Sequence, residues 1–177
     1  MSHEISKSTN IGVPCGKPLP RLAVINLLPE HIQIIRNHSE STYPEECCGI
    51  ILGYINNQTK TVVEIVPTEN AWSSESANFD SEDTKYSEIK RYAIAPQVML
   101  QVQKAARDKT LNIIGIYHSH PDHAAIPSEC DRQYAWPEYS YIIVSVPNGK
   151  AGELLSWSLD DHHQFQPESI DTISLAT

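Results

Sequence analysis

The sequence predicts a mixed α/β domain, and two observations lead to this expectation. Short apolar runs rich in β-branched residues alternate with segments whose apolar residues recur at helical spacing. Several of the apolar runs are joined by short turns, which indicates hairpins rather than a regular βαβ alternation. With 177 residues, the chain has the length of one domain that can bury a sizeable core.

The expected elements follow one another along the chain. Strands are predicted over 22–28, 47–55, 61–66, 90–94, 111–117, 139–146 and 153–159, with a candidate edge strand over 162–165. Helices are predicted from Pro29 to about Ser41 and from Pro96 to near Asp108, because proline suits the first turn of a helix. A short helix is predicted over 128–136. Gly49 and Gly53 in the second strand indicate a close approach of another chain segment.

The chain divides into an arm, a folded domain and a tail. Residues 1–20 are polar with several glycines and prolines, which predicts a disordered N-terminal arm. Residues 21–166 form the expected domain, and residues 167–177 form a fraying C-terminal tail. Residues 67–88 are rich in Ser, Glu, Asp and Asn and predict a loop of unusual length. This loop either shapes a binding groove or is a solvated insertion.

Charge and composition restrict the possible partners. The formal net charge of −9 disfavours binding to nucleic acid or to an anionic membrane surface. No apolar stretch approaches the length of a membrane span, and the first 20 residues lack the apolar core of a signal peptide. The four cysteines form no CxxC pair, so free thiols in a reducing compartment are expected. These features predict a cytoplasmic protein.

Two histidines stand at the end of the apolar run 113–117. His118 and His120 are two residues apart, so on an extended backbone both side chains point to the same side. They can therefore offer two imidazole nitrogens to one metal ion, and Asp131 can add a carboxylate oxygen. Three protein ligands with one open position are typical of a catalytic zinc, which makes a water molecule acidic near neutral pH.

Such a site also needs a general base, for which Glu46 and Glu45 are the candidates.

Ser128 has two interpretations. With Asp131 three residues later, it matches a helix N-cap with a capping box. Its hydroxyl can alternatively stabilise the oxyanion of a tetrahedral intermediate. The two interpretations compete for Asp131, because a carboxylate that binds zinc is less free to cap a helix.

The same stretch also fits the HxHxDH pattern of the metallo-β-lactamase fold, from His118 to His123. That fold needs a large second half after the motif, which supplies further metal ligands. Only 54 residues follow His123 (177 − 123), and they contain His162 and His163. A lactamase-type hydrolase is therefore disfavoured by length.

The spacing from His118-Ser119-His120-Pro121 to Ser128 and Asp131 resembles the JAMM motif of the MPN+ zinc isopeptidases. The upstream segment 43–53, YPEECCGIILG, resembles the glutamate-bearing segment of that family and favours Glu46 over Glu45. The resemblance covers roughly residues 22–159. It implies the MPN, or JAB, α/β fold: a curved mixed β-sheet with helices packed against it.

The resemblance also implies roles for individual residues. It assigns one Zn²⁺ per chain to His118, His120 and Asp131, with Glu46 as the base and Ser128 as the oxyanion donor. In its short length, in the segment RYAI over 91–94 before Pro96 and in SWSL over 156–159, the chain is similar to a small bacterial branch linked to ubiquitin-like sulfur-carrier proteins. The implied reaction is hydrolysis of the bond after the carrier's Gly-Gly tail, which releases cysteine or a C-terminal extension. An adenylyltransferase of the same pathway is an implied partner, and a non-catalytic MPN module that binds such a carrier is the alternative.

Overall fold

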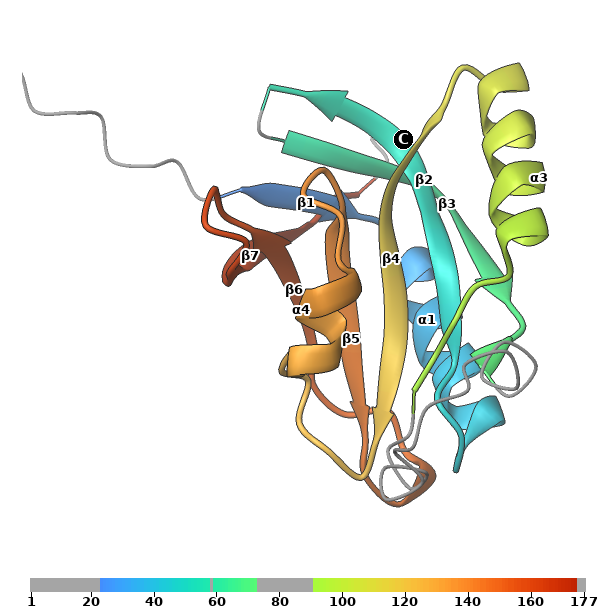
Figure 1. The fold of residues 1–177 in the computed structure, drawn as a ribbon, viewed down its shortest axis with the longest axis vertical. Helices are drawn as coiled ribbons and strands as arrows, with labels where there is room; N and C mark the ends of the chain where they lie inside the picture. The colour runs from blue at the N-terminus through green and yellow to red at the C-terminus, as the bar shows by residue number, and fades with distance from the viewer. Residues whose placement is uncertain (1–22, 58, 73–90, 175–177) are drawn as a thin grey trace, which may run out of the picture.

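A single sheet of seven strands curves round and closes on itself (Figure 1). The computed structural model describes residues 23–57, 59–72 and 91–174. In these residues the strands are β1 Val24–Leu27, β2 Cys48–Asn56, β3 Thr59–Thr68, β4 Asn112–Pro121, β5 Ser140–Val146, β6 Leu154–Leu159 and β7 Phe165–Thr172. Their spatial order is β1-β3-β2-β4-β5-β6-β7, and β1 pairs in parallel with both β3 and β7. The predicted curved mixed sheet is confirmed, and β1 closes it into a barrel.

Helices cover the two faces of β2. The described helices are α1 Pro29–Thr42, α3 Pro96–Asp108, α4 Glu129–Tyr134 and the 3-10 turn η3 Pro147–Gly149. Ile51 packs in one buried cluster with Ile35 of α1, while its neighbour Ile50 packs in a second cluster with Ala106 of α3. Adjacent residues of a strand point to opposite faces, so β2 is buried on both sides. None of the described helices is long and apolar enough to cross a membrane.

β4 lies at the centre of the sheet, antiparallel to β2 and parallel to β5. It runs four residues beyond the predicted end at Tyr117, because the pairing with β5 continues to Pro121 opposite Val146. The expected close approach at Gly49 is present: a Cβ atom there would lie 2.3 Å from the Tyr117 ring. Only glycine therefore lets β2 pass over this buried tyrosine.

The sequence places the C-terminal end of the domain too early. Residues 167–172, assigned to a fraying tail, belong to β7 and pair with β6 and β1. Glu168 of β7 is 6% exposed and accepts hydrogen bonds from Ser140 (2.9 Å) and Ser156 (2.6 Å), while Lys60 donates to the Ser140 hydroxyl (2.9 Å). A long-range polar network thus fixes a segment whose local sequence is polar.

The predicted strand over 90–94 is wrong for its described part, because residues 91–95 form no strand. Both edges of β2 are already paired, with β3 and β4, so no free edge is available there. The segment is held instead at Ala93. Its N–H donates to the side-chain oxygen of Asn70, and its carbonyl accepts from the N–H of Ala71. The candidate edge strand over 162–165 begins only at Phe165, after a turn in which His163 has a φ of 57°.

The long loop predicted over 67–88 is described only at its start. Pro67 and Thr68 still belong to β3, which extends two residues beyond the predicted end. Residues 73–88 lie outside the described part of the chain, as does the predicted arm over 1–20.

Candidate metal centre

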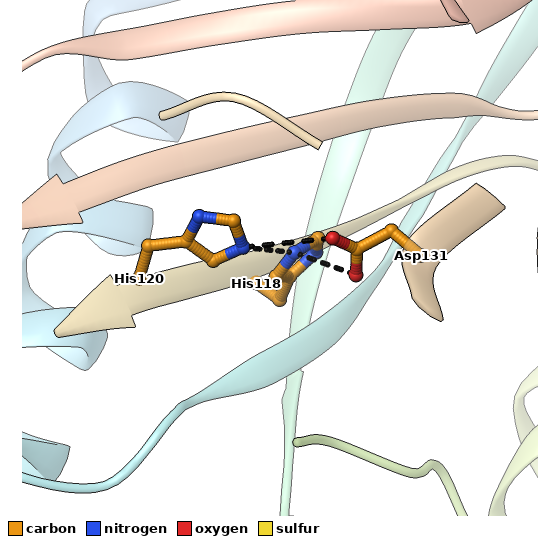
Figure 2. A group of neighbouring side chains, drawn as sticks. All are labelled: His118, His120 and Asp131. Atoms are coloured by element: carbon orange, nitrogen blue, oxygen red, sulfur yellow. Dashed lines mark hydrogen bonds and ion pairs between the residues drawn. The ribbon is translucent and has the colours of Figure 1, made fainter. Parts of the chain in front are cut away.

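Three side chains from two elements meet beside the end of β4 (Figure 2). The Nε2 atoms of His118 and His120 lie 3.0 Å apart. Asp131 of α4 places Oδ1 at 3.2 Å from His118 Nε2 and Oδ2 at 3.7 Å from His120 Nε2. The structure thus brings together the three residues that the sequence predicts as ligands, although they span 14 positions of the chain (118–131).

The local fold of α4 fixes the Asp131 carboxylate. The Ser128 backbone N–H donates to Asp131 Oδ2 (2.6 Å), and the Asp131 backbone N–H donates to Ser128 Oγ (3.1 Å). This is the predicted capping box. The expected competition for Asp131 is absent, because Oδ2 accepts the capping bond while Oδ1 faces His118. Ser128 Oγ acts as an acceptor in the cap, so its own proton stays available for donation.

Contacts behind the two imidazoles orient them differently. His120 Nδ1 lies 2.8 Å from the Ala124 carbonyl, which can only accept, so Nδ1 carries a proton and Nε2 is the nitrogen that would bind a metal after losing its own proton. The ring of His118 is fully buried and stacks on Tyr92, with ring centroids 4.4 Å apart. His118 Nδ1 is buried without a hydrogen-bond partner. Stacking and the sheet pairing therefore hold His118 in place.

The electrostatics of the cluster favour a cation. Burial lowers the pKa of His118, which keeps that imidazole neutral and able to bind a metal. Burial also disfavours ionisation of Asp131, but the hydrogen bonds to His118 and His120 outweigh it and hold its pKa well below the ordinary range. For His120, burial lowers the pKa, yet the bonds to Asp131 and the Ala124 carbonyl raise it more. An anionic carboxylate thus faces two imidazole nitrogens.

The geometry of these donors fits a zinc ion. Two ligand atoms that each lie about 2.0–2.2 Å from a tetrahedral Zn²⁺ are separated by about 3.3–3.5 Å. The two Nε2 atoms are 3.0 Å apart, and the carboxylate approaches His118 to 3.2 Å through Oδ1 and His120 to 3.7 Å through Oδ2. One ligand atom from each of the three residues lies within 4.8 Å of the others, which is close to the separation that zinc needs. Two nitrogens and one carboxylate oxygen also form a donor set that zinc accepts, with one position left for water or substrate. His118, His120 and Asp131 can therefore hold the metal without rearrangement of the backbone.

The β2–β4 pairing places Glu46 next to this cluster. Cys48 is opposite His118, and the Ser119 N–H donates to the Cys47 carbonyl (3.1 Å). Continuing that register puts Glu46 opposite His120, on the same face of the sheet as both histidines. Glu46 is 8% exposed, and its charge is among the influences that raise the pKa of His120. Glu45 instead lines a cavity of about 430 Å³ together with His38 and Thr42.

Asn70 ties the Glu46 segment to the segment that covers the cluster. Its amide nitrogen donates to the carbonyls of Glu46 (3.1 Å) and Arg91 (2.9 Å). Its amide oxygen accepts from the N–H groups of Trp72 (3.0 Å) and Ala93 (3.0 Å). All four hydrogen-bonding positions of the amide are used. Sequence reasoning missed Asn70 and Tyr92, because neither lies in a motif and their partners are distant in the chain.

The other histidines of the lactamase-type pattern take no part in the cluster. His123 is exposed, and His163 Nε2 lies 2.9 Å from the Arg132 carbonyl on α4. Among the described residues, the only group of three or more His, Cys, Asp or Glu side chains placed to hold a metal is His118, His120 and Asp131. The structure therefore offers no support for the second half of a lactamase site.

Comparison with known proteins adds to this picture. The family of prokaryotic homologues of the JAB domain matches residues 28–160. The desampylase of Haloferax volcanii is 29% identical over 108 residues, a match that covers 60% of this chain and 66% of the desampylase, just under two thirds of its length.

Two solved structures resemble the fold. A solution structure from Salinibacter ruber is 30% identical with a TM-score of 0.61, and the match covers 84% of this chain and 90% of that protein. A second solution structure, from Desulfitobacterium hafniense, is 23% identical with a TM-score of 0.67 and covers 85% and 94% of the two chains. The second likeness concerns the fold alone.

Proposed function

The chain belongs to the family of prokaryotic homologues of the JAB domain, and we propose on that premise that it is a zinc-dependent peptidase or isopeptidase. The observation that supports this most directly is the convergence of His118, His120 and Asp131, with Glu46 two residues before the paired strand β2. The match to the desampylase also supports a hydrolytic enzyme.

The protein's own residues would carry out the proton transfers. Zinc held by His118, His120 and Asp131 would supply Lewis acidity, which lowers the pKa of water and polarises the scissile carbonyl. Glu46 would accept the proton of the attacking water and then deliver it to the leaving amine. The Ser128 hydroxyl, whose proton the helix cap leaves available, would donate to the oxyanion of the tetrahedral intermediate. No covalent intermediate with the protein is needed.

The proposed substrate is a ubiquitin-like or sulfur-carrier protein, cleaved after its Gly-Gly tail in the cytoplasm. A Gly-Gly tail has no side chains, so its backbone can lie extended in a narrow groove. An adenylyltransferase of the same pathway is the further partner that this substrate implies. The net charge of −9 is compatible with a carrier that has a basic docking surface, but it does not require one.

The test is to load the chain with zinc, incubate it with candidate carriers and weigh the products by mass spectrometry. We expect a carrier shortened to its Gly-Gly end, and we expect Glu46→Gln to bind one equivalent of zinc without turnover. Glu45→Gln is the matched control and should keep activity. A chain that binds carriers and neither holds stoichiometric zinc nor cleaves them would be a non-catalytic MPN module.

A further inference from the structure

Arg91 is a cation in the segment next to the metal centre, and the hydrogen-bonding capacity of its Nε atom is not used. Its Nε atom is buried without a hydrogen-bond partner, one of only two such side-chain atoms in the described residues. The guanidinium lies over the ring of Trp72, with its central carbon 5.2 Å from the ring centroid. An arginine that stacks on an aromatic ring has a fixed orientation but gains no hydrogen bond from the stacking.

Several contacts place Arg91 at the edge of the cluster. Its carbonyl accepts from Asn70, which also holds the carbonyl of Glu46. The next residue, Tyr92, stacks on His118. Arg91 therefore lies in the backbone segment that Asn70 ties to Glu46 and that places Tyr92 over His118.

Such an arrangement is costly for the folded protein unless a ligand completes it. A buried donor on a charged group loses its water without gaining a partner. The structural alternative is charge balance, since Glu46 and Asp131 bring negative charge to this region. Charge balance needs a nearby cation, but it does not require a guanidinium with an unused, buried donor. An oriented guanidinium whose Nε–H has no partner suits a carboxylate, which can bind a guanidinium through two parallel hydrogen bonds.

We propose that Arg91 forms a subsite for a carboxylate on the leaving group of the substrate. This rests on the proposed function, in which a bond after a Gly-Gly tail is cut. A leaving group that is one C-terminal residue carries its own α-carboxylate close to the scissile nitrogen. A lysine side chain joined through an isopeptide bond carries none there. Arg91 thus selects single-residue adducts or the last residue of a precursor over conjugates to lysine.

The experiment uses two acetylated peptides that end in Gly-Gly-Ala, one with a free carboxylate and one with a carboxamide. For the zinc-loaded chain we expect kcat/KM about 10–100-fold higher for the carboxylate, because a charged hydrogen-bonded pair is lost in the carboxamide. In Arg91→Gln the ratio should fall to about 1, through a loss confined to the carboxylate peptide. Arg107→Gln removes the same charge from the exposed end of α3 and should keep the ratio.

Three results would overturn the proposal: a ratio near 1 in the unaltered chain, an unchanged ratio in Arg91→Gln, or an equal loss on both peptides. The last result would mean that Arg91 only balances charge. If the unaltered chain cleaves neither peptide, the proposed function is still tested separately on whole carriers. Calorimetric titration of Glu46→Gln with the two peptides then decides the subsite, since tighter binding of the carboxylate supports it and equal binding contradicts it.

Discussion

Removal of the Asn70 side chain tests whether a residue outside the ligand motif fixes the position of Glu46, the proposed base. Asn70→Ala deletes four hydrogen bonds between 2.9 and 3.1 Å and leaves two carbonyls and two N–H groups to find other partners. A typical intramolecular hydrogen bond contributes about 0.5–1.5 kcal/mol net. Because these groups are only partly buried, water replaces some of the loss. We expect the free energy of unfolding to fall by about 2–4 kcal/mol.

The effect on function should separate turnover from metal binding. The three ligands lie on β4 and α4, and none of the four hydrogen bonds of the Asn70 side chain goes to either element, so zinc affinity should change little. The Glu46 backbone loses one anchor, and a small misplacement of a reacting group can reduce the rate about 100-fold. We therefore expect kcat to fall by about 10–100-fold at a temperature where the variant remains folded.

Urea unfolding, zinc titration and carrier cleavage measure these three quantities on one preparation. Asn37→Ala is the matched control, because Asn37 is exposed on α1 and bonded only to Gln33 in the described structure. Its stability should change by less than about 0.5 kcal/mol. A stable Asn70→Ala variant with full turnover would refute the reasoning, and a large loss of zinc affinity would show that the anchor acts on the ligands instead.

Three further predictions concern the cluster and its surroundings. Zinc at 100 times its dissociation constant should stabilise the chain by about 2.7 kcal/mol, and thermal unfolding should show this for His123→Ala but not for His120→Ala. Ser128→Ala should lower kcat by about 10²–10³-fold besides a capping loss of about 1 kcal/mol; a stability loss with intact kcat would leave Ser128 as a cap alone. Burial raises the pKa of Cys48 from its ordinary value near 9 to about 11. The unfolded chain therefore releases this proton first, and stability present below pH 9 is lost as the pH rises towards 11, by about 2–3 kcal/mol. Urea unfolding of the metal-free protein at pH 8 and 11 measures the loss, and Cys48→Ala should show a smaller one.

Local patterns predict the elements that have local causes. Pro29 and Pro96 mark the starts of α1 and α3, and Ser128 and Asp131 close their capping box within four residues. The wrong predictions fall where distant partners decide. Residues 167–172 are polar, yet β7 forms because β1 and β6 offer free edges. Residues 91–94 resemble a strand, yet β2 has no edge left to pair with them.

The candidate site shows the same division. The sequence by itself determines that His118 and His120 share one side of a strand and that Asp131 and Ser128 cap one helix, since these relations depend on the geometry of a few neighbouring residues. Only the tertiary structure decides that β2 pairs Cys48 with His118 and so brings the Glu46 segment to the cluster, that Tyr92 stacks on His118, and that Asn70 joins the two segments. These contacts depend on strand pairing and on hydrogen bonds between segments far apart in the chain, and no local pattern of residues specifies such distances.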